Sequence, residues 1–291
     1  MEFLYLKYFK KIAEYEHITR AAQELHVAQS ALSRVLKSLE TELGVKLFDR
    51  SGKNIILNKN GKIMLEYTNQ ILSLINDMKR DLHEQHDKNP TIIILVKVAS
   101  KFLPDIISGF HKIHPDVNFI IIQNDIDDIK KNQIWDVCID ASINPIEDKH
   151  TNLLLKEEIC LAMPKDHPLA VNDSVYLEEV SSESFIGMQK GSRMNEIADY
   201  YCNRAGFHPN IILESDNPAT LRGLMRIGMG IAFNPIITWK EMSDDKICLV
   251  KIKGEHCFRY INLSLKDKKH YSNIILDFKK YLISFFASLK S

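Results

Sequence analysis

The sequence predicts an α/β protein with an all-α-rich head that carries a small two-stranded wing. Three observations predict this fold class. Helical periodicity runs through the first 48 residues, no proline occurs before Pro90, and short apolar runs alternate with helix-like segments after Pro90. A chain of 291 residues is long enough for two or three domains.

The composition is that of a folded protein with no membrane partner. Hydrophobic residues make up 45% and charged residues 26% of the chain, which argues against a disordered or fibrous protein. No stretch reaches the roughly 18 apolar residues that a membrane helix needs, and lysines stand near the N-terminus where a signal segment would be apolar. We therefore expect a cytoplasmic protein.

The formal net charge of zero conceals a difference between the two ends of the chain. Residues 1–62 contain 11 Lys and Arg against 7 Asp and Glu, whereas the rest contains 27 against 31. A basic head on a slightly acidic body is typical of a protein that holds nucleic acid at one end. An ordinary solvated surface explains so small a surplus equally well, so the charge difference by itself does not predict nucleic-acid binding.

The spacing of apolar residues divides the head into three helices. The periodicity breaks at residues 16–18 and 26–28, and Thr19 can cap the second helix. A short helix over residues 20–25, a three-residue turn and a longer helix over residues 29–39 have the spacing of a helix-turn-helix.

The outer face of the longer helix has the residue types that bind DNA. The residues expected to be buried are Ala31, Leu32, Val35, Leu36 and Leu39. The residues left on the outer face are Gln29, Ser30, Ser33, Arg34 and Lys37. Such side chains contact base edges and phosphates where a recognition helix enters the major groove. The alternative is the solvated face of an ordinary helical hairpin.

A polar turn follows the longer helix and predicts a wing. The turn, residues 50–54, separates the apolar pair Leu47–Phe48 from a second apolar run over residues 55–57. Two strands joined in this way place Arg50 and Lys53 where they can contact the phosphate backbone or the minor groove. Together with Leu43, which we expect in the core, these elements make a winged helix-turn-helix over residues 1–58.

The head resembles the LysR-type transcriptional regulator family. The resemblance is carried by LKYF at residues 6–9, TRAAQELHVAQSALSR at 19–34, LETELGVKLFDR at 39–50 and LNKNG at 57–61. Asn58 and Asn60 depart from the Thr and Ala that members commonly have, although Asn58 can still cap the next helix. The resemblance implies that the head binds double-stranded DNA. The predicted DNA-binding residues are Thr19, Arg20, Gln29, Ser30, Ser33, Arg34, Lys37, Arg50 and Lys53.

One long helix is expected from Asn58 to about His86, as a linker domain over residues 59–88. Its seam alternates steps of four and three residues: Met64, Thr68, Ile71, Ile75, Met78 and Leu82. Heptad spacing favours pairing with a second copy of the same helix, and the alternative is packing on the C-terminal domain of the same chain. The resemblance implies pairing, in a homodimer or homotetramer. The predicted dimerisation residues are Met64, Ile71, Ile75, Met78 and Leu82.

The remainder, residues 89–291, is predicted to be an α/β domain. Its strand-like runs are residues 92–96, 117–122, 137–139, 159–163, 185–188, 230–233, 247–252 and 260–265. The resemblance, supported by further motifs across this half, implies two lobes similar to periplasmic solute-binding proteins, joined by two crossing strands with an effector cleft between them. We place the crossings near Leu161–Lys165 and Leu263–Asp267.

These crossings define the two lobes. The first lobe is predicted at about residues 89–162 and 266–291, and the second at about residues 163–265. An amphipathic helix over residues 271–289 then returns the chain to the first lobe.

The resemblance also places candidate effector contacts in the cleft. Counting back from Leu103, many members have an effector-binding Ser or Thr where this chain has Lys97, and a lysine there favours an anionic effector such as a carboxylate. If the loop is shifted, Ser100 takes that role and Lys101 points to solvent. A cleft without any ligand is the third alternative.

A predicted helix start supplies a second candidate anion site. Asn217 can cap this helix with Pro218 in its first turn, which leaves free N–H groups facing an anion, although a purely structural cap has the same pattern. The full set of predicted effector-binding residues is Lys97, Ser100, Met188, Gln189, Asn217, Thr220 and Asn234.

The cysteines and histidines do not form recognisable metal or disulfide patterns. The five cysteines have no C-x-x-C pair and are expected to be reduced, buried thiols: Cys138, Cys160, Cys202, Cys248 and Cys257. Because one branch of the family senses oxidation with cysteines, a thiol-based redox regulator is an alternative. The His83/His86 and His111/His114 pairs have no Cys or acidic cluster beside them and are expected on the surface.

No sequence motif for catalysis or for a cofactor was found. We therefore predict no enzyme activity, no cofactor and no metal. The predicted function is a regulator in which an effector changes lobe closure, the spacing of paired heads and the bend of a pseudo-palindromic operator. A solute-binding or enzymatic α/β protein with an incidental helical head is a further alternative.

Overall fold

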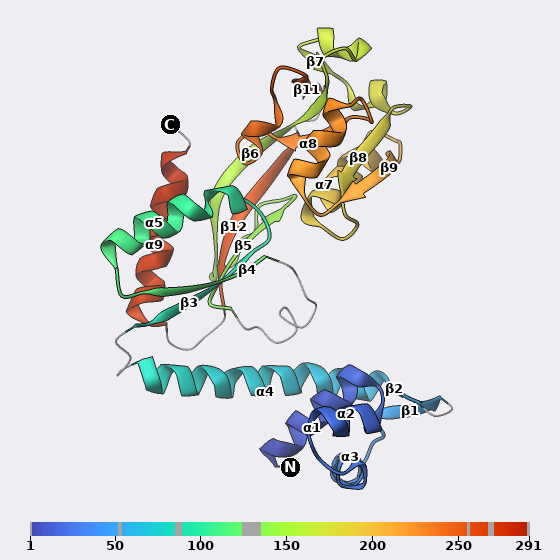
Figure 1. The fold of residues 1–291 in the computed structure, drawn as a ribbon, viewed down its shortest axis with the longest axis vertical. Helices are drawn as coiled ribbons and strands as arrows, with labels where there is room; N and C mark the ends of the chain where they lie inside the picture. Colours follow the sequence, from blue (N-terminus) through green and yellow to red (C-terminus); the bar gives the residue numbers. More distant parts are fainter. Residues whose placement is uncertain are drawn as a thin grey trace. The chain divides into compact units, whose positions relative to one another are not determined.

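The computed structural model describes residues 2–51, 54–84, 89–123, 135–254, 257–266 and 271–289. It contains two compact units, one that ends at Pro90 and one that begins at Thr91 (Figure 1). The change of unit lies close to the division between residues 88 and 89 that the sequence predicts.

Three helices and a two-stranded sheet form the head of the first unit. They are α1 (Phe3–Tyr15), α2 (Ile18–Glu24), α3 (Gln29–Leu43), β1 (Phe48–Ser51) and β2 (Asn54–Leu57). The strands are antiparallel, with Phe48 opposite Leu57. The buried residues on the inner faces of these elements include Phe9, Ile12, Ala21, Ala22, Leu32, Leu36, Leu39, Leu47 and Phe48. This arrangement confirms the predicted winged helix-turn-helix.

Three local predictions for the head are wrong. The second helix begins before Thr19, because Nδ1 of His17 caps it by accepting the backbone N–H of Arg20 at 3.4 Å. Ala31 is exposed, since a step of one residue turns it about 100° away from buried Leu32. Leu43 is also exposed, in the last turn of α3.

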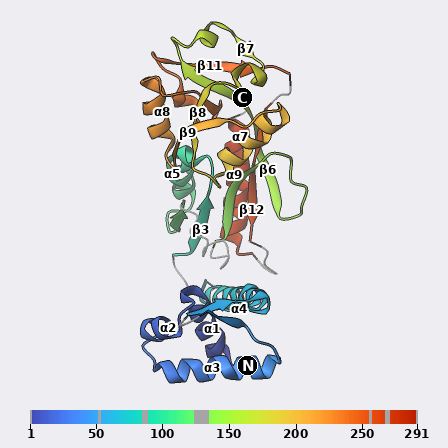
Figure 2. The same cartoon turned by 90° about the vertical axis from the view of Figure 1, so that its right-hand side faces the viewer.

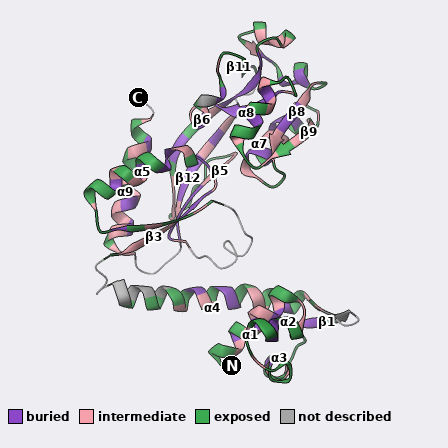
Figure 3. Cartoon of the chain, in the orientation of Figure 1, coloured by how far each residue is buried: buried purple, intermediate pink, exposed green. Residues whose placement is uncertain are grey.

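A long helix, α4 (Lys59–Glu84), completes the first unit and confirms the predicted linker helix, whose expected last residues lie outside the described residues. Asn58 caps it as predicted, because its Oδ1 accepts the backbone N–H of Gly61 at 3.0 Å. Met64 packs against the core of the head. Farther along, the apolar side chains of Met78 and Leu82 are 52% and 64% exposed. Figure 3 shows exposed stretches along α4.

The first lobe of the second unit is built on a mixed sheet. Its strands are β3 (Thr91–Val96), β4 (Asn118–Ile122), β5 (Val137–Ser142) and β12 (Phe258–Leu265), in the order β4-β3-β5-β12. The helices α5 (Leu103–Ile113) and α9 (Asn273–Ser288) contact each other beside it, with the rings of Phe110 and Phe278 4.9 Å apart. The last helix therefore returns to the first lobe, as predicted.

The second lobe contains the other strands. These strands are β6 (Thr151–Pro164), β7 (Ser174–Val175), β10 (Ala232–Pro235) and β11 (Ile247–Ile252). They lie in the order β6-β11-β7, and β10 also pairs with β6. A separate parallel pair, β8 (Ser184–Met188) and β9 (Asn210–Ser215), lies beside α7 (Arg193–Arg204) and α8 (Pro218–Arg226) (Figure 2). Short 3-10 turns occur at Ser100–Phe102, Pro168–Val171, Leu177–Val180 and Lys240–Met242.

The strand pairing corrects both predicted crossings between the lobes. Strand β6 runs through both lobes: Glu158 pairs with β12 of the first lobe, and the next residue, Ile159, pairs with β10 of the second. This change precedes Leu161–Lys165. The chain returns between β11 and β12, because β12 already pairs with β5 from Tyr260 onward. Residues 258–265 therefore belong to the first lobe, and the crossing near Leu263–Asp267 is wrong.

Candidate DNA-binding surface and effector cavity

Helix α3 presents a polar face to solvent. Gln29, Ser30, Arg34 and Lys37 are exposed, and Ser33 is half-buried. Nε2 of Gln29 donates a hydrogen bond to Oγ of Ser33 at 3.0 Å, which fixes these two side chains against each other. The opposite face of the helix packs Leu32 and its neighbours into the core. The face therefore presents polar side chains at the end of the helix that meets base edges in a helix-turn-helix protein.

The structure describes the side chains of only some of the other predicted DNA-binding residues. Thr19 and Arg20 are exposed on α2. Arg50 lies in β1, but its side chain is outside the described part, and Lys53 lies outside the described residues altogether. These assignments remain predictions.

The second unit contains a cavity of about 570 Å³ between the lobes. Of the predicted effector-binding residues, those that line it are Lys97, Ser100, Met188 and Asn217. Those that do not are Gln189, Thr220 and Asn234. Lys101, which the second alternative placed in solvent, also lines the cavity, so that part of the prediction is wrong: both lysines and Ser100 border the same space.

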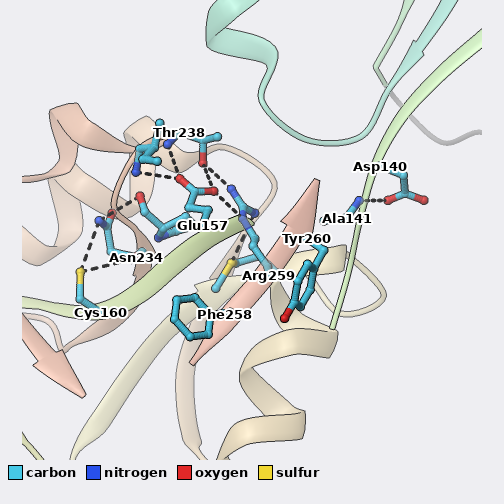
Figure 4. A network of polar contacts seen from close by, with 12 residues as sticks. Asp140, Ala141, Glu157, Cys160, Asn234, Thr238, Phe258, Arg259 and Tyr260 are labelled. Atoms are coloured by element: carbon cyan, nitrogen blue, oxygen red, sulfur yellow. Dashed lines mark hydrogen bonds and ion pairs between the residues drawn. The ribbon is translucent and has the colours of Figure 1, made fainter. Parts of the chain in front are cut away.

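Asn234, predicted to line the cleft, is instead buried within β10. Its side-chain amide donates to the carbonyl oxygen of Pro235 at 3.3 Å and contacts the sulfur of Cys160, whose thiol donates to the carbonyl of Asn234 at 3.2 Å (Figure 4). The prediction was wrong because a residue near the end of a strand can face either side of its sheet.

Several cationic side chains line the cavity, and each of its three arginines is paired with a carboxylate. The cationic lining residues are Lys97, Lys101, Arg193, Arg222 and Arg259, and the carboxylate among the lining residues is Asp216. The start of α8 also faces the cavity, with Asn217 as its cap: Oδ1 accepts the backbone N–H of Ala219 at 2.8 Å. Both features attract an anion. The three arginines were missed because they come from separate elements and no local spacing links them.

One of these arginines joins the two lobes. The guanidinium of Arg193 on α7 binds both carboxylate oxygens of Asp140 on β5, with distances of 2.8 Å from Nε and 2.9 Å from Nη2. Its Nη1 donates to Glu196 at 2.7 Å. The hydrogen bonds with Asp140 raise the pKa of Arg193 above its ordinary value, so the guanidinium stays charged.

A second arginine, Arg259, belongs to a buried network beside the cavity (Figure 4). Its Nε donates to Oε2 of Glu157 at 2.9 Å, and its Nη2 donates to the hydroxyl of Thr238. The hydroxyl of Thr238 in turn donates to Oε2 of Glu157 at 3.1 Å. Burial lowers the pKa of Arg259, and the charge of Glu157 opposes that effect. The network ties β6, β12 and the segment after β10 together.

The cysteines are mainly buried thiols. Cys138, Cys160, Cys202 and Cys257 are buried as predicted, whereas Cys248 is half-buried, and none of the five forms a disulfide. Burial raises the pKa of Cys160 to about 11 and that of Cys202 to about 12, and it also raises the pKa of Cys248. The raised pKa values of Cys160 and Cys202 favour the protonated thiol, which is a weaker nucleophile than the thiolate.

The described helices include none with the length and apolar character that a bilayer crossing requires. This finding agrees with the polar and charged residues along α4, the longest of them.

Comparison with known proteins assigns both units to one family. Residues 4–62 match the profile of the bacterial regulatory helix-turn-helix protein, lysR family, and residues 91–287 match that of the LysR substrate binding domain. Two relatives from Bacillus subtilis (strain 168) align over nearly the whole chain. The HTH-type transcriptional regulator YybE is 31% identical, covering 99% of this chain and 100% of its own, and the transcriptional dual regulator GltC is 30% identical, covering 100% and 99%.

Solved structures share the fold at lower sequence identity. Full-length CbnR complexed with its target DNA has a TM-score of 0.64 at 20% identity and covers 97% of this chain and 99% of its own. Full-length OxyR C199D from Pseudomonas aeruginosa has a TM-score of 0.62 at 21% identity, covering 98% and 94%. With both domain profiles matched in order along the chain, the protein belongs to the LysR family of transcriptional regulators.

Proposed function

We propose that the protein binds pseudo-palindromic double-stranded DNA as a homodimer or homotetramer, and that a small anionic effector in the cavity modulates this binding. The observation that carries the DNA-binding part is the exposed polar face of α3, opposite a fully formed core. Because a regulator of this kind acts on chromosomal DNA, we propose that the protein is cytoplasmic. The proposal assigns no catalytic activity to the chain.

The proposed division of labour follows the three predicted domains. Residues 1–58 bind DNA, residues 59–88 pair the subunits, and residues 89–291 bind the effector. Gln29, Ser30, Ser33 and Arg34 read bases, because their types and positions suit the major groove. The proposed phosphate contacts are Thr19, Arg20, Lys37, Arg50 and Lys53.

Arg34→Ala is expected to weaken specific binding about 10- to 100-fold, since one good bidentate base contact contributes about 1–3 kcal/mol. The measurement is fluorescence anisotropy with duplexes from the promoter regions beside the protein's own gene. Lys7→Ala is the matched control, because Lys7 is exposed on α1, outside the proposed DNA-binding set. Wild-type affinity that stays constant as salt rises from low to physiological concentration would contradict the proposed phosphate contacts.

The cavity supports the effector part of the proposal. Its volume of about 570 Å³ is in the range of small-molecule sites, and its cationic side chains and helix start favour an anion. The mechanism we propose is coupling: binding between the lobes changes their closure and thereby the placement of the paired heads on DNA.

A thiol-based redox sensor is the second candidate function, and the raised pKa values of Cys160 and Cys202 speak against it. We expect that micromolar peroxide leaves the DNA affinity of wild-type protein unchanged. A variant with all five cysteines replaced by serine or alanine should respond in the same way. A peroxide-dependent footprint that disappears in this variant would favour the redox function instead.

A further inference from the structure

Helix α7 of the second lobe begins with a residue that a helix start does not favour. Arg193 is its first residue and follows the cap Ser192, whose side chain accepts the backbone N–H of Asn195 at 3.2 Å. The N-terminus of a helix carries a partial positive charge, and a cation at this end adds to it. Glu196 in the same turn pairs with Arg193 at 2.7 Å, but the stability of α7 alone does not explain an arginine at this position.

The side chain of Arg193 reaches out of its own lobe. Its Nε and Nη2 donate to the two carboxylate oxygens of Asp140 in β5 of the first lobe, at 2.8 and 2.9 Å. Asp140 is itself held in place, because its Oδ1 also accepts the backbone N–H of Ala141 at 2.8 Å (Figure 4). A two-point contact of this kind fixes both the distance and the orientation of the groups that it joins.

This ion pair differs from an ordinary surface pair. Most exposed pairs contribute little, because water screens them and two long side chains must be ordered. The side chains of Arg193 and Asp140 are only 32% and 22% exposed, and the guanidinium meets the carboxylate with two parallel hydrogen bonds. Two-point geometry and partial burial are the conditions under which an ion pair contributes to structure.

A second contact fastens the other half of α7 close to the connection between the lobes. The hydroxyl of Tyr201 donates to the carbonyl oxygen of Phe258 at 2.7 Å, and the backbone N–H of Phe258 donates to that hydroxyl at 2.9 Å. Phe258 is the first residue of β12, where the chain returns from the second lobe. Tyr201 lies about 12 Å along the helix from Arg193, at about 1.5 Å per residue.

Helix α7 is therefore attached at two points with different relations to the hinge. A rotation of the second lobe about the connecting strands leaves Tyr201 near Phe258, but it moves the start of the helix. On an arm of about 12 Å, a rotation of about 20° displaces Arg193 by about 4 Å, which is enough to break both hydrogen bonds with Asp140.

We infer that the Arg193–Asp140 ion pair is a latch that holds the two lobes in the arrangement described here, and that its release allows the lobes to move apart. The strands that connect the lobes stay intact in both arrangements, whereas a hinge rotation has to break this contact. The inference goes beyond the proposed function, which names no group that holds the lobes. Only its consequence for DNA binding rests on that function.

The experiment measures the distance between the lobes in the full chain without DNA. A donor and an acceptor dye are attached at Lys112 in the first lobe and Glu178 in the second, both of which are exposed. An unnatural amino acid at each position carries the dye, so that the cysteines are not modified. Doubly labelled chains are diluted with unlabelled chains, and single-molecule energy transfer then reports the distance within one subunit.

Two substitutions release the latch to different degrees. Asp140→Asn keeps the shape of the side chain and removes its charge. The equilibrium constant for the more open arrangement is expected to rise at least about 5-fold, the lower end of typical coupling between two conformations. Arg193→Lys keeps the positive charge but cannot make the two-point contact, so its shift has the same direction and a smaller size.

The matched control removes the same kind of ion pair within one lobe. Asp244 pairs with Arg222 and Arg226, and all three residues belong to the second lobe. Asp244→Asn is therefore expected to leave the distance between the lobes unchanged, because the charges that it separates move together in a hinge rotation.

Salt gives a test that needs no substitution. Raising sodium chloride from about 0.05 M to about 0.5 M weakens a partly exposed ion pair by screening. The wild type is expected to shift toward the more open arrangement, and Asp140→Asn is expected to show no such shift. This comparison with the wild type keeps the test decisive if a variant fails to fold.

The inference is overturned if folded Asp140→Asn and Arg193→Lys both keep the distance distribution of the wild type, or if Asp244→Asn shifts it equally. A wild type whose distribution is insensitive to salt also contradicts the latch. If the lobes separate in Asp140→Asn while its affinity for operator DNA stays that of the wild type, the latch is supported and the proposed coupling to DNA is contradicted instead.

Discussion

Glu157→Ala is expected to lower the stability of the second unit by about 3–5 kcal/mol, because it leaves the guanidinium of Arg259 buried without its counter-charge. Both groups are almost completely buried. The substitution also removes the acceptor for the backbone N–H groups of Ile237 and Thr238. For a unit of this size the loss corresponds to a fall of about 6–15 °C in the unfolding temperature. Scanning calorimetry of the full chain measures it.

Two further variants separate charge from packing in this network. Glu157→Gln keeps an oxygen for the backbone N–H groups and is expected to cost less than the alanine variant. The double substitution Glu157→Leu with Arg259→Met removes both charges and should recover much of the stability, since apolar residues of similar size often replace a buried ion pair without loss. An alanine variant within about 1 kcal/mol of the wild type would show that the ion pair is not needed for stability.

The second large effect is expected in the linker helix. Met78→Glu combined with Leu82→Glu should raise the dissociation constant of the dimer at least about 1000-fold, because each replaced side chain contributes roughly 1.5–3 kcal/mol when buried between subunits. In the single chain these two side chains are 52% and 64% exposed on α4. Analytical ultracentrifugation measures the association, and operator affinity should fall with it because each head then binds alone.

The control places the same charges on the opposite face of the same helix. Gln70 and Asn76 are exposed and lie outside the predicted seam. Gln70→Glu with Asn76→Glu is therefore expected to leave the dimer intact, since two carboxylates on a solvated helix face interact weakly. Equal association of both double variants would show that the seam does not pair subunits.

Much of the head could be predicted from the sequence because its contacts are local. The helices follow from apolar spacing, and the family resemblance rests on residues that are continuous in the chain. The errors were also local. His17 rather than Thr19 caps α2, since the exact end of a helix is difficult to place from sequence. Ala31 faces outward because each step of one residue in a helix turns the side chain by about 100° around the axis.

In the second unit the sequence indicated the elements but not their partners. The run over residues 260–265 reads as a strand, yet nothing in it says that β5 is its neighbour, and so the second crossing was placed too late. Apolar alternation specifies which residues can be buried. It does not specify which strand lies beside another, because pairing joins segments that are far apart in the chain.

The residues that line the cavity likewise include some that could be predicted from the sequence and some that could not. Lys97, Ser100 and Asn217 could be predicted because a motif or a cap stands next to each of them in the sequence. The arginines could not, since Arg193 pairs with Asp140 and Arg259 with Glu157, 53 and 102 residues away. The sequence by itself determined the family, the head and the linker helix, through local periodicity. Only the tertiary structure decided which charges meet around the cavity, because ion pairs depend on distances in space and leave no period in the chain.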